Sequence, residues 1–201
     1  MPTPPIAERR PHKIQSPHGE RDDAYFWLRD DTRSDPQMLA YIEAENSHTD
    51  AVLAPLKALE DRIFDEIVGR MKKDDSSVPY RHRGHYYYSR YEKGHEYAIH
   101  CRKSGSLEAQ EQVLINVNEA AKDHDYYAVS SPKPSPDDRW QVFAEDTVGR
   151  CQYALRFQEL GTEKDLADRI ENTTGEVIWA EDSKTVFYVE KDPETLLGTK
   201  V

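Results

Sequence analysis

The feature that most constrains the fold is a change in the spacing of apolar residues near residue 75. Before it, apolar residues recur every three or four positions, which is the spacing of one face of a helix. These residues are Leu56, Leu59, Ile63, Ile67 and Met71. After it, short runs rich in Val, Tyr and Phe alternate with turn residues, a pattern typical of antiparallel strands. The sequence therefore predicts a helical part, 1–75, followed by a β part, 76–201.

The helical part carries its own start and stop signals. Asp35 followed by Pro36 is an N-cap with proline at the first helical position, where the missing N–H costs nothing. The pattern predicts a helix from about 36 to 54, which Pro55 ends before a second helix begins. The aromatic run in 22–31 predicts a short helix whose rings dock on the rest of the protein.

The β part is expected to contain short strands joined by hairpin-length loops. The predicted strands are 85–91, 97–102, 112–117, 140–145, 152–157, 177–179 and 185–190. Three of them share one plan, in which a polar turn leads into an apolar strand that ends in charge. Aligning Tyr87, Phe143 and Phe187 gives steps of 56 and 44 residues.

Repeats of this length in an all-β chain indicate propeller blades of four strands each. About two and a half blades fit in the sequence, so the β part is expected to be incomplete. Residues 195–201 have the pattern of an opening strand. We expect Val186 to Glu190 to form an edge whose N–H and C=O groups are unpaired.

Composition excludes several classes of partner. The chain has 27 basic and 38 acidic residues, a formal net charge of −11, which disfavours binding to nucleic acid or to an anionic membrane. No stretch is apolar for the length of a membrane span, and no secretory signal is present. Cys101 and Cys151 lie in apolar or aromatic contexts and are predicted to be buried, reduced thiols of a cytoplasmic protein.

A search for chemistry-bearing motifs finds neither a G-x-S-x-G nucleophile elbow nor a glycine-rich phosphate loop. Four histidines fall within 19 residues and offer either a metal site or, as we favour, a polar strand face. They are His82, His85, His95 and His100.

The best charged cluster is Glu145–Asp146 near Arg150. Paired carboxylates can do acid–base work, but a turn stabilised by a carboxylate–arginine contact is the favoured interpretation here. We therefore predict no catalytic, cofactor-binding or metal-binding residue in this chain, and no cofactor.

Several stretches together resemble one family. Segments 23–31 and 41–46 look like the N-terminal signature of prolyl oligopeptidase-type serine peptidases, and 86–94 looks like the first blade of the oligopeptidase B branch. The most specific match runs from Ser135-Pro136-Asp137-Asp138 to Thr173, and residues 177–193 continue it. The resemblance covers roughly residues 5 to 201.

The resemblance implies a two-domain enzyme in which a seven-bladed propeller covers an α/β-hydrolase domain with a Ser-Asp-His triad. It implies that residues 1–75 form a helical arm that packs on the hydrolase domain, and that residues 76–201 form the first blades. The triad lies in a part of the family that this chain does not contain.

In the intact enzyme, the implied activity is cleavage of short peptides after Arg or Lys. The propeller acts as a sieve that excludes folded proteins, and the partners are short peptides, the hydrolase domain and the remaining blades. We expect the chain alone to be inactive and marginally stable. A free-standing propeller-blade module for binding or scaffolding is the alternative, and an independent hydrolase is disfavoured by the missing nucleophile elbow.

Overall fold

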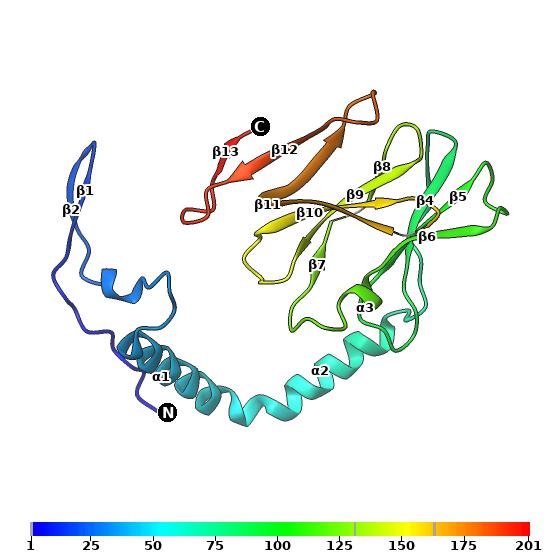
Figure 1. Cartoon of the computed structure of the whole chain (residues 1–201). Coiled ribbons are helices and arrows are strands. Elements are labelled where there is room, and N and C mark those ends of the chain that lie inside the picture. Colours follow the sequence, from blue (N-terminus) through cyan, green and yellow to red (C-terminus); the bar gives the residue numbers. More distant parts are fainter. Residues whose placement is uncertain (1, 131, 163) are drawn as a thin grey trace. The chain divides into compact units, whose positions relative to one another are not determined.

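The computed structural model describes residues 2–130, 132–162 and 164–201. The chain, drawn in Figure 1, divides into two compact units, Met1–Met71 and Lys72–Val201. The first unit is largely helical and the second consists of β-sheets. The fold is therefore mainly β with an N-terminal helical arm, as the sequence predicts.

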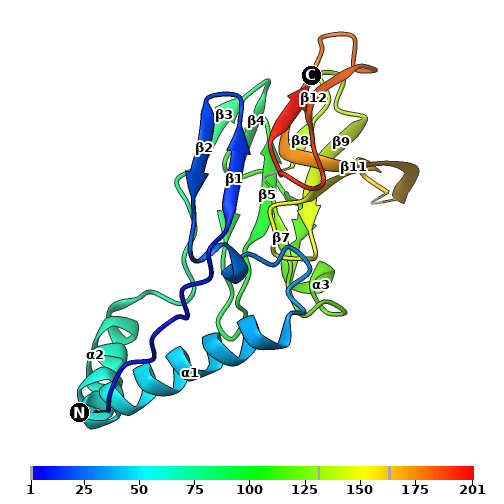
Figure 2. The same ribbon diagram turned by 90° about the vertical axis from the view of Figure 1, so that its left-hand side faces the viewer.

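The first unit begins with a hairpin that the sequence pattern did not reveal. Strands β1 (Lys13–Ser16) and β2 (Gly19–Asp22) pair antiparallel and are almost entirely exposed (Figure 2). Their residues are polar or charged on both faces, so they lack the apolar alternation by which a half-buried strand is recognised.

The aromatic run forms a single 3-10 turn, η1 (Phe26–Leu28), rather than a longer helix. Trp27 is fixed from three sides. Its indole N–H donates to the Glu8 carbonyl at 2.8 Å, the Arg10 guanidinium lies 4.2 Å over its ring, and Tyr41 meets it edge-on at 5.9 Å. The predicted short helix is therefore reduced to one turn in which no residue is buried, and Tyr25 is 45% exposed, while Trp27 docks within the first unit.

Helix α1 (Pro36–Leu53) begins where the sequence predicts. The Asp35 carboxylate accepts hydrogen bonds from the backbone N–H groups of Gln37 and Met38 at 2.8 and 3.1 Å, which caps the helix. A 3-10 turn, η2 (Ala54–Leu56), contains Pro55 and leads into α2 (Lys57–Arg70). The apolar stripe of α2 is 42–63% exposed at Leu56, Leu59, Ile63, Ile67 and Met71.

The second unit opens with a four-stranded antiparallel sheet, which we call blade 1. Its strands are β3 (Tyr80–His82), β4 (His85–Arg90), β5 (Ile99–Ser104) and β6 (Glu111–Asn116), in that spatial order. Arg83 and Gly84 both have positive φ in the two-residue turn between β3 and β4, which matches the twist of a tight hairpin. A short helix, α3 (Val117–Ala120), follows β6.

The remaining strands form two further blades that share one long strand (Figure 1). The strands are β7 (Ala128–Val129), β8 (Lys133–Pro134), β9 (Trp140–Asp146), β10 (Tyr153–Glu159), β11 (Lys164–Trp179), β12 (Val186–Lys191) and β13 (Gly198–Lys200).

Strand β11 pairs with β10 through its first part, and its second part pairs mainly with β12. Asn172 and Gly175, both with positive φ, lie between the two parts. We therefore call the sheet of β7 to β10 and the first part of β11 blade 2, and the sheet from Val177 onward blade 3. Three antiparallel blades that do not close a ring within the described residues make up a partial β-propeller.

Two details of the predicted strands are wrong. Val177–Trp179 is only the end of a 16-residue strand, because the charged side chains of residues 164–171 hide the strand period. Strand β12 is not a free edge along its whole length, because β13 pairs with Glu190 and Lys191. The sequence pattern also missed β3, β7 and β8, which are only two or three residues long.

Alternation along β9 explains how the blades pack. Val142 and Ala144 face Leu155 and Phe157 of β10 and Val177 of blade 3, and all five are buried in one core cluster. Phe143, on the opposite face of β9, packs with Ile115, Val117 and Tyr127 on the blade 1 side. A period of two therefore gives β9 one face for each neighbouring blade.

The two cysteines differ from each other. Cys101 is 1% exposed, and burial raises the pKa of its thiol to about 12, as expected for an inert buried cysteine. Cys151 is exposed, so its predicted burial is wrong. It lies in a turn with φ of 55°, where its N–H donates to the Asp146 carboxylate at 2.7 Å.

We predict that Leu155→Ala lowers the free energy of unfolding by about 2–5 kcal/mol, because Leu155 is fully buried between blades 2 and 3. The matched control is Val148→Ala, at a side chain that is 63% exposed, and it should stay within about 0.5 kcal/mol of the parent. Urea denaturation of the two variants makes the comparison. Equal effects would contradict the assignment of this core.

Candidate functional site

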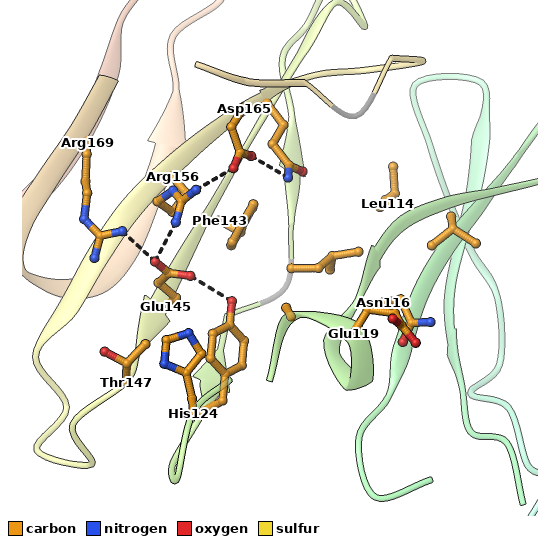
Figure 3. A pocket seen from close by; sticks show the side chains of 15 residues that line it. Leu114, Asn116, Glu119, His124, Phe143, Glu145, Thr147, Arg156, Asp165 and Arg169 are labelled. Atoms are coloured by element: carbon orange, nitrogen blue, oxygen red, sulfur yellow. Dashed lines mark hydrogen bonds and ion pairs between the residues drawn. The ribbon is translucent and has the colours of Figure 1, made fainter. Parts of the chain in front are cut away.

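A group of charged side chains in the second unit surrounds Glu145 (Figure 3). Glu145 is 6% exposed. Its Oε1 accepts hydrogen bonds from Arg156 at 2.9 Å and Arg169 at 2.7 Å, and its Oε2 accepts one from the Tyr127 hydroxyl at 2.8 Å. The carboxylate thus accepts hydrogen bonds from two guanidinium groups and one phenol hydroxyl.

Strand register assembles this group. Arg156 of β10 lies opposite Phe143 of β9 and Arg169 of β11, so its side chain shares a face with Glu145, two residues after Phe143. A second carboxylate, Asp165, accepts from Arg156 at 2.5 Å and from the Gln158 amide at 2.8 Å. Contacts between residues that are 7 to 24 positions apart in sequence therefore form one network.

The electrostatics follow from these contacts. Burial alone would raise the pKa of Glu145, but the hydrogen bonds from Tyr127, Arg156 and Arg169 outweigh it and hold the pKa below its usual value. Burial and the hydrogen bond to Glu145 raise the pKa of Tyr127 well above its usual value. Glu145 is therefore ionised and Tyr127 neutral at physiological pH.

A cavity of about 570 Å³ opens beside the network, between blade 1 and blade 2. Its walls also include Asn116, Glu119, His124 and Thr147 (Figure 3). The volume is in the range of small-molecule sites. However, both oxygens of Glu145 already accept strong hydrogen bonds, so the carboxylate is poorly placed to take a proton from a ligand. The arrangement suits holding β9, β10 and β11 together better than acid–base chemistry.

The predicted interpretation of Glu145–Asp146 needs one correction. Glu145 is indeed in a carboxylate–arginine cluster, but its partners are Arg156 and Arg169 and not Arg150. The register of β9, β10 and β11 brings Arg156 and Arg169 beside Glu145. Proximity in the sequence therefore pointed to the wrong arginine. Asp146 instead accepts from the backbone N–H groups of Val148, Gly149 and Cys151, which fixes the following turn.

The histidines do not gather at one point. His82 and His85 face each other across the β3–β4 hairpin. His100 is hydrogen-bonded through Nδ1 to the Ser89 hydroxyl at 3.0 Å, and burial lowers its pKa. Within residues 2–130, 132–162 and 164–201, no group of three or more His, Cys, Asp or Glu side chains is arranged to hold a metal ion. The sequence-based expectation that the chain holds no catalytic, cofactor-binding or metal-binding residue stays a prediction.

In the part of the chain that the structure describes, no helix is long and apolar enough to cross a lipid bilayer.

Stacked antiparallel blades with apolar cores between them define the class of this protein as a β-propeller module. The particular family follows from the sequence. Residues 5–200 match the family described as prolyl oligopeptidase, N-terminal beta-propeller domain. The chain belongs to this family, which confirms the resemblance found in the sequence.

Individual relatives agree with the family. Dipeptidyl aminopeptidase BI of Pseudoxanthomonas mexicana is 46% identical over 99% of this chain, and Protease 2 of Moraxella lacunata is 31% identical over 94% of it. Oligopeptidase B from Leishmania major superposes with a TM-score of 0.86 at 32% identity over 98% of this chain. The chain spans only 28–30% of the length of these three proteins.

We predict that Glu145→Gln destabilises the fold by about 1–3 kcal/mol at neutral pH, because it removes the charged acceptor that Arg156 and Arg169 share, while Asp165 and Glu171 still pair with these arginines. The matched control is Glu119→Gln. Glu119 lines the same cavity but its carboxylate is exposed and pairs with Lys122, so little change is expected.

The pH dependence has a defined sign. The folded-state pKa of Glu145 is lowered, so its stabilisation is complete above the unfolded value of about 4.3 and is lost as the pH falls through the folded value. In the Glu145→Gln variant, the free energy of unfolding should therefore fall less steeply as the pH is lowered. Denaturant titration at several pH values measures this slope. If the free energy of unfolding of this variant falls with decreasing pH as steeply as that of the parent, the assigned network is contradicted.

Proposed function

We propose that this chain is the N-terminal part of a serine oligopeptidase that cleaves short peptides after Arg or Lys, with the catalytic triad in the remainder of the protein. The observation that carries the proposal is the match to oligopeptidase B over 98% of the chain, at a TM-score of 0.86. Protease 2, at 31% identity, supports the same assignment. In this proposal the propeller blades carry no catalytic triad. They contribute to the enzyme's structure and to the selection of its substrates.

The propeller is proposed to act as a size-excluding gate. Blades that pack through the buried face of Val142, Leu155 and Val177 are rigid, so a ring built from such blades leaves an opening of fixed width. A short, extended peptide passes such an opening, and a folded domain does not. This arrangement protects folded proteins without requiring recognition of their sequence.

The helical arm is proposed to pack on the hydrolase domain. Its exposed stripe on α2 is large, apolar and continuous, with Leu59, Ile63 and Ile67 42–56% exposed. An apolar patch of this kind on a stable protein usually marks an interface. Residues 1–75 then join the propeller and the hydrolase domain in one molecule.

A second candidate is an exopeptidase that releases dipeptides from peptide N-termini. The specific observation in its favour is the 46% identity to a protein named dipeptidyl aminopeptidase BI. The two candidates share fold and triad chemistry and differ in whether a free substrate amino group is required.

We expect the 201-residue chain alone to hydrolyse neither substrate class, because an activated nucleophile is required. The protein extended by the residues encoded downstream should cleave an N-blocked arginyl chromogenic peptide, and a serine-directed inhibitor should abolish the activity. The matched substrate carries citrulline in place of arginine, which keeps the side-chain length and removes the charge.

The outcomes separate the candidates. Equal rates on the arginine and citrulline substrates would refute the basic specificity. Cleavage of an unblocked dipeptidyl substrate but not of the blocked one would favour the exopeptidase. Inhibitor-sensitive cleavage by the 201-residue chain itself would overturn the placement of the triad in the remainder of the protein.

We predict that Ile67→Asp in the extended protein lowers stability by several kcal/mol, because it removes an apolar side chain from the interface and places a charge there. The control is Ile6→Asp in the same unit, at a side chain that is 86% exposed. Thermal unfolding of the two variants tests the docking of α2. Identical melting temperatures for both variants and the parent would count against it.

A further inference from the structure

The turn that joins β8 to β9 contacts the blades on both sides of its own. This turn, residues 135–138, is the Ser-Pro-Asp-Asp stretch that the sequence singled out. It is rigid: the Ser135 hydroxyl donates to the Asp137 carboxylate at 2.6 Å and accepts from the Trp140 N–H at 3.0 Å. Neither the Glu145 network nor the 570 Å³ cavity includes it.

On one side the turn binds blade 1. The Asp138 carboxylate accepts from Arg102 Nη1 at 2.6 Å. Arg102 belongs to β5 and is only 4% exposed, and its Nε donates to Gln112 at 2.7 Å. Asp138 has a φ of 57°, a left-handed conformation that Asp tolerates better than most residues.

On the other side the turn binds blade 3. The backbone N–H of Asp137 donates to the Ser183 hydroxyl at 3.0 Å. Ser183 lies in the turn before β12 and also has a φ of 57°. Asp138 and Ser183 thus occupy equivalent positions in successive blades, and each reaches back to the preceding blade.

The contact to blade 1 is the one with a buried charge. Among the residues that the structure describes, Asp138 is the only carboxylate within ion-pair distance of Arg102. The Arg102 side chain is 5% exposed and that of Asp138 is 37% exposed, so removing the carboxylate leaves a buried charge uncompensated, which is costly. A third cross-blade contact, between Arg83 and Glu181, joins exposed side chains and is expected to contribute little.

We infer that Asp138 is a positioning residue of the size-excluding gate: through Arg102 it fixes the angle between blades 1 and 2, and so determines the length of peptide that the enzyme admits. This inference rests on the proposed peptidase function. An ion pair with hydrogen bonds has a preferred direction, whereas the attraction between apolar side chains is non-directional. Loss of the pair therefore loosens the gate without touching the site of chemistry.

The experiment uses the full-length protein with Asp138→Asn, Arg102→Met, the double variant, and Glu181→Gln as the control for an exposed cross-blade pair. The double variant leaves no buried charge unpaired, so it remains informative if a single variant folds poorly. Two quantities are measured: stability, for a double-mutant cycle between positions 102 and 138, and kcat/KM for a long unstructured peptide relative to a short one with the same cleavage site.

We expect the cycle to be strongly non-additive. We also expect Asp138→Asn and the double variant to raise the ratio for long over short peptides by about tenfold, with kcat for the short peptide unchanged. Glu181→Gln should change neither quantity. A purely structural role would lower activity on both peptides by loss of folded protein and leave the ratio constant.

Additive stabilities would overturn the coupling of the two blades by this pair. A constant ratio in the folded double variant would overturn the role in length selection. If the wild-type protein cleaves neither peptide, the proposed function itself fails and the role in the gate fails with it, while a non-additive cycle would still establish the contact between the blades. The two failures are therefore distinguishable.

Discussion

The structure of the second unit depends on burying both faces of β9. A strand has two faces, and each must be covered by another sheet when both carry apolar residues. Val142 and Ala144 cover the blade 3 side and Phe143 the blade 1 side. Stacking of the blades follows from this constraint. Polar groups that are largely buried between blades, such as Glu145 at 6% exposure, must then find most of their partners within the protein.

The two buried ionic contacts solve that problem in different ways. Glu145 binds Arg156 and Arg169, which come from the same sheet, so the network stiffens one blade internally. Asp138 binds Arg102 of the neighbouring blade, so the contact fixes one blade relative to another. Only the second kind of contact can influence the opening of a ring built from blades. This difference, and not the number of charges, separates a structural network from a positioning contact.

Much of the fold was readable from local pattern. The Asp35 cap, the break at Pro55 and the strands at 85–90 and 140–146 carry clear signals of period, capping or turn chemistry. The contacts of Glu145 could not be predicted from local sequence, because its arginine partners are determined by the register between β9, β10 and β11. Arg150 was closer in sequence, but the ion pairs of Glu145 among the described residues are with Arg156 and Arg169. Short inner strands such as β7 and β8 leave too few residues to show any period.

The two junctions between blades also differ in chemistry, and this difference gives them different mechanical properties. Blades 2 and 3 meet over the large cluster around Leu155, with a neutral hydrogen bond from Asp137 to Ser183 at the turn. Blades 1 and 2 meet over a smaller cluster around Phe143, with a buried arginine held by Asp138. A close-packed apolar junction resists displacement through many small non-directional contacts, whereas the buried Arg102 depends on a single carboxylate and loses its compensation when that partner moves away. We therefore expect the angle at the junction between blades 1 and 2 to depend most on a single side chain, and the proposed size-excluding gate to be most sensitive to changes there.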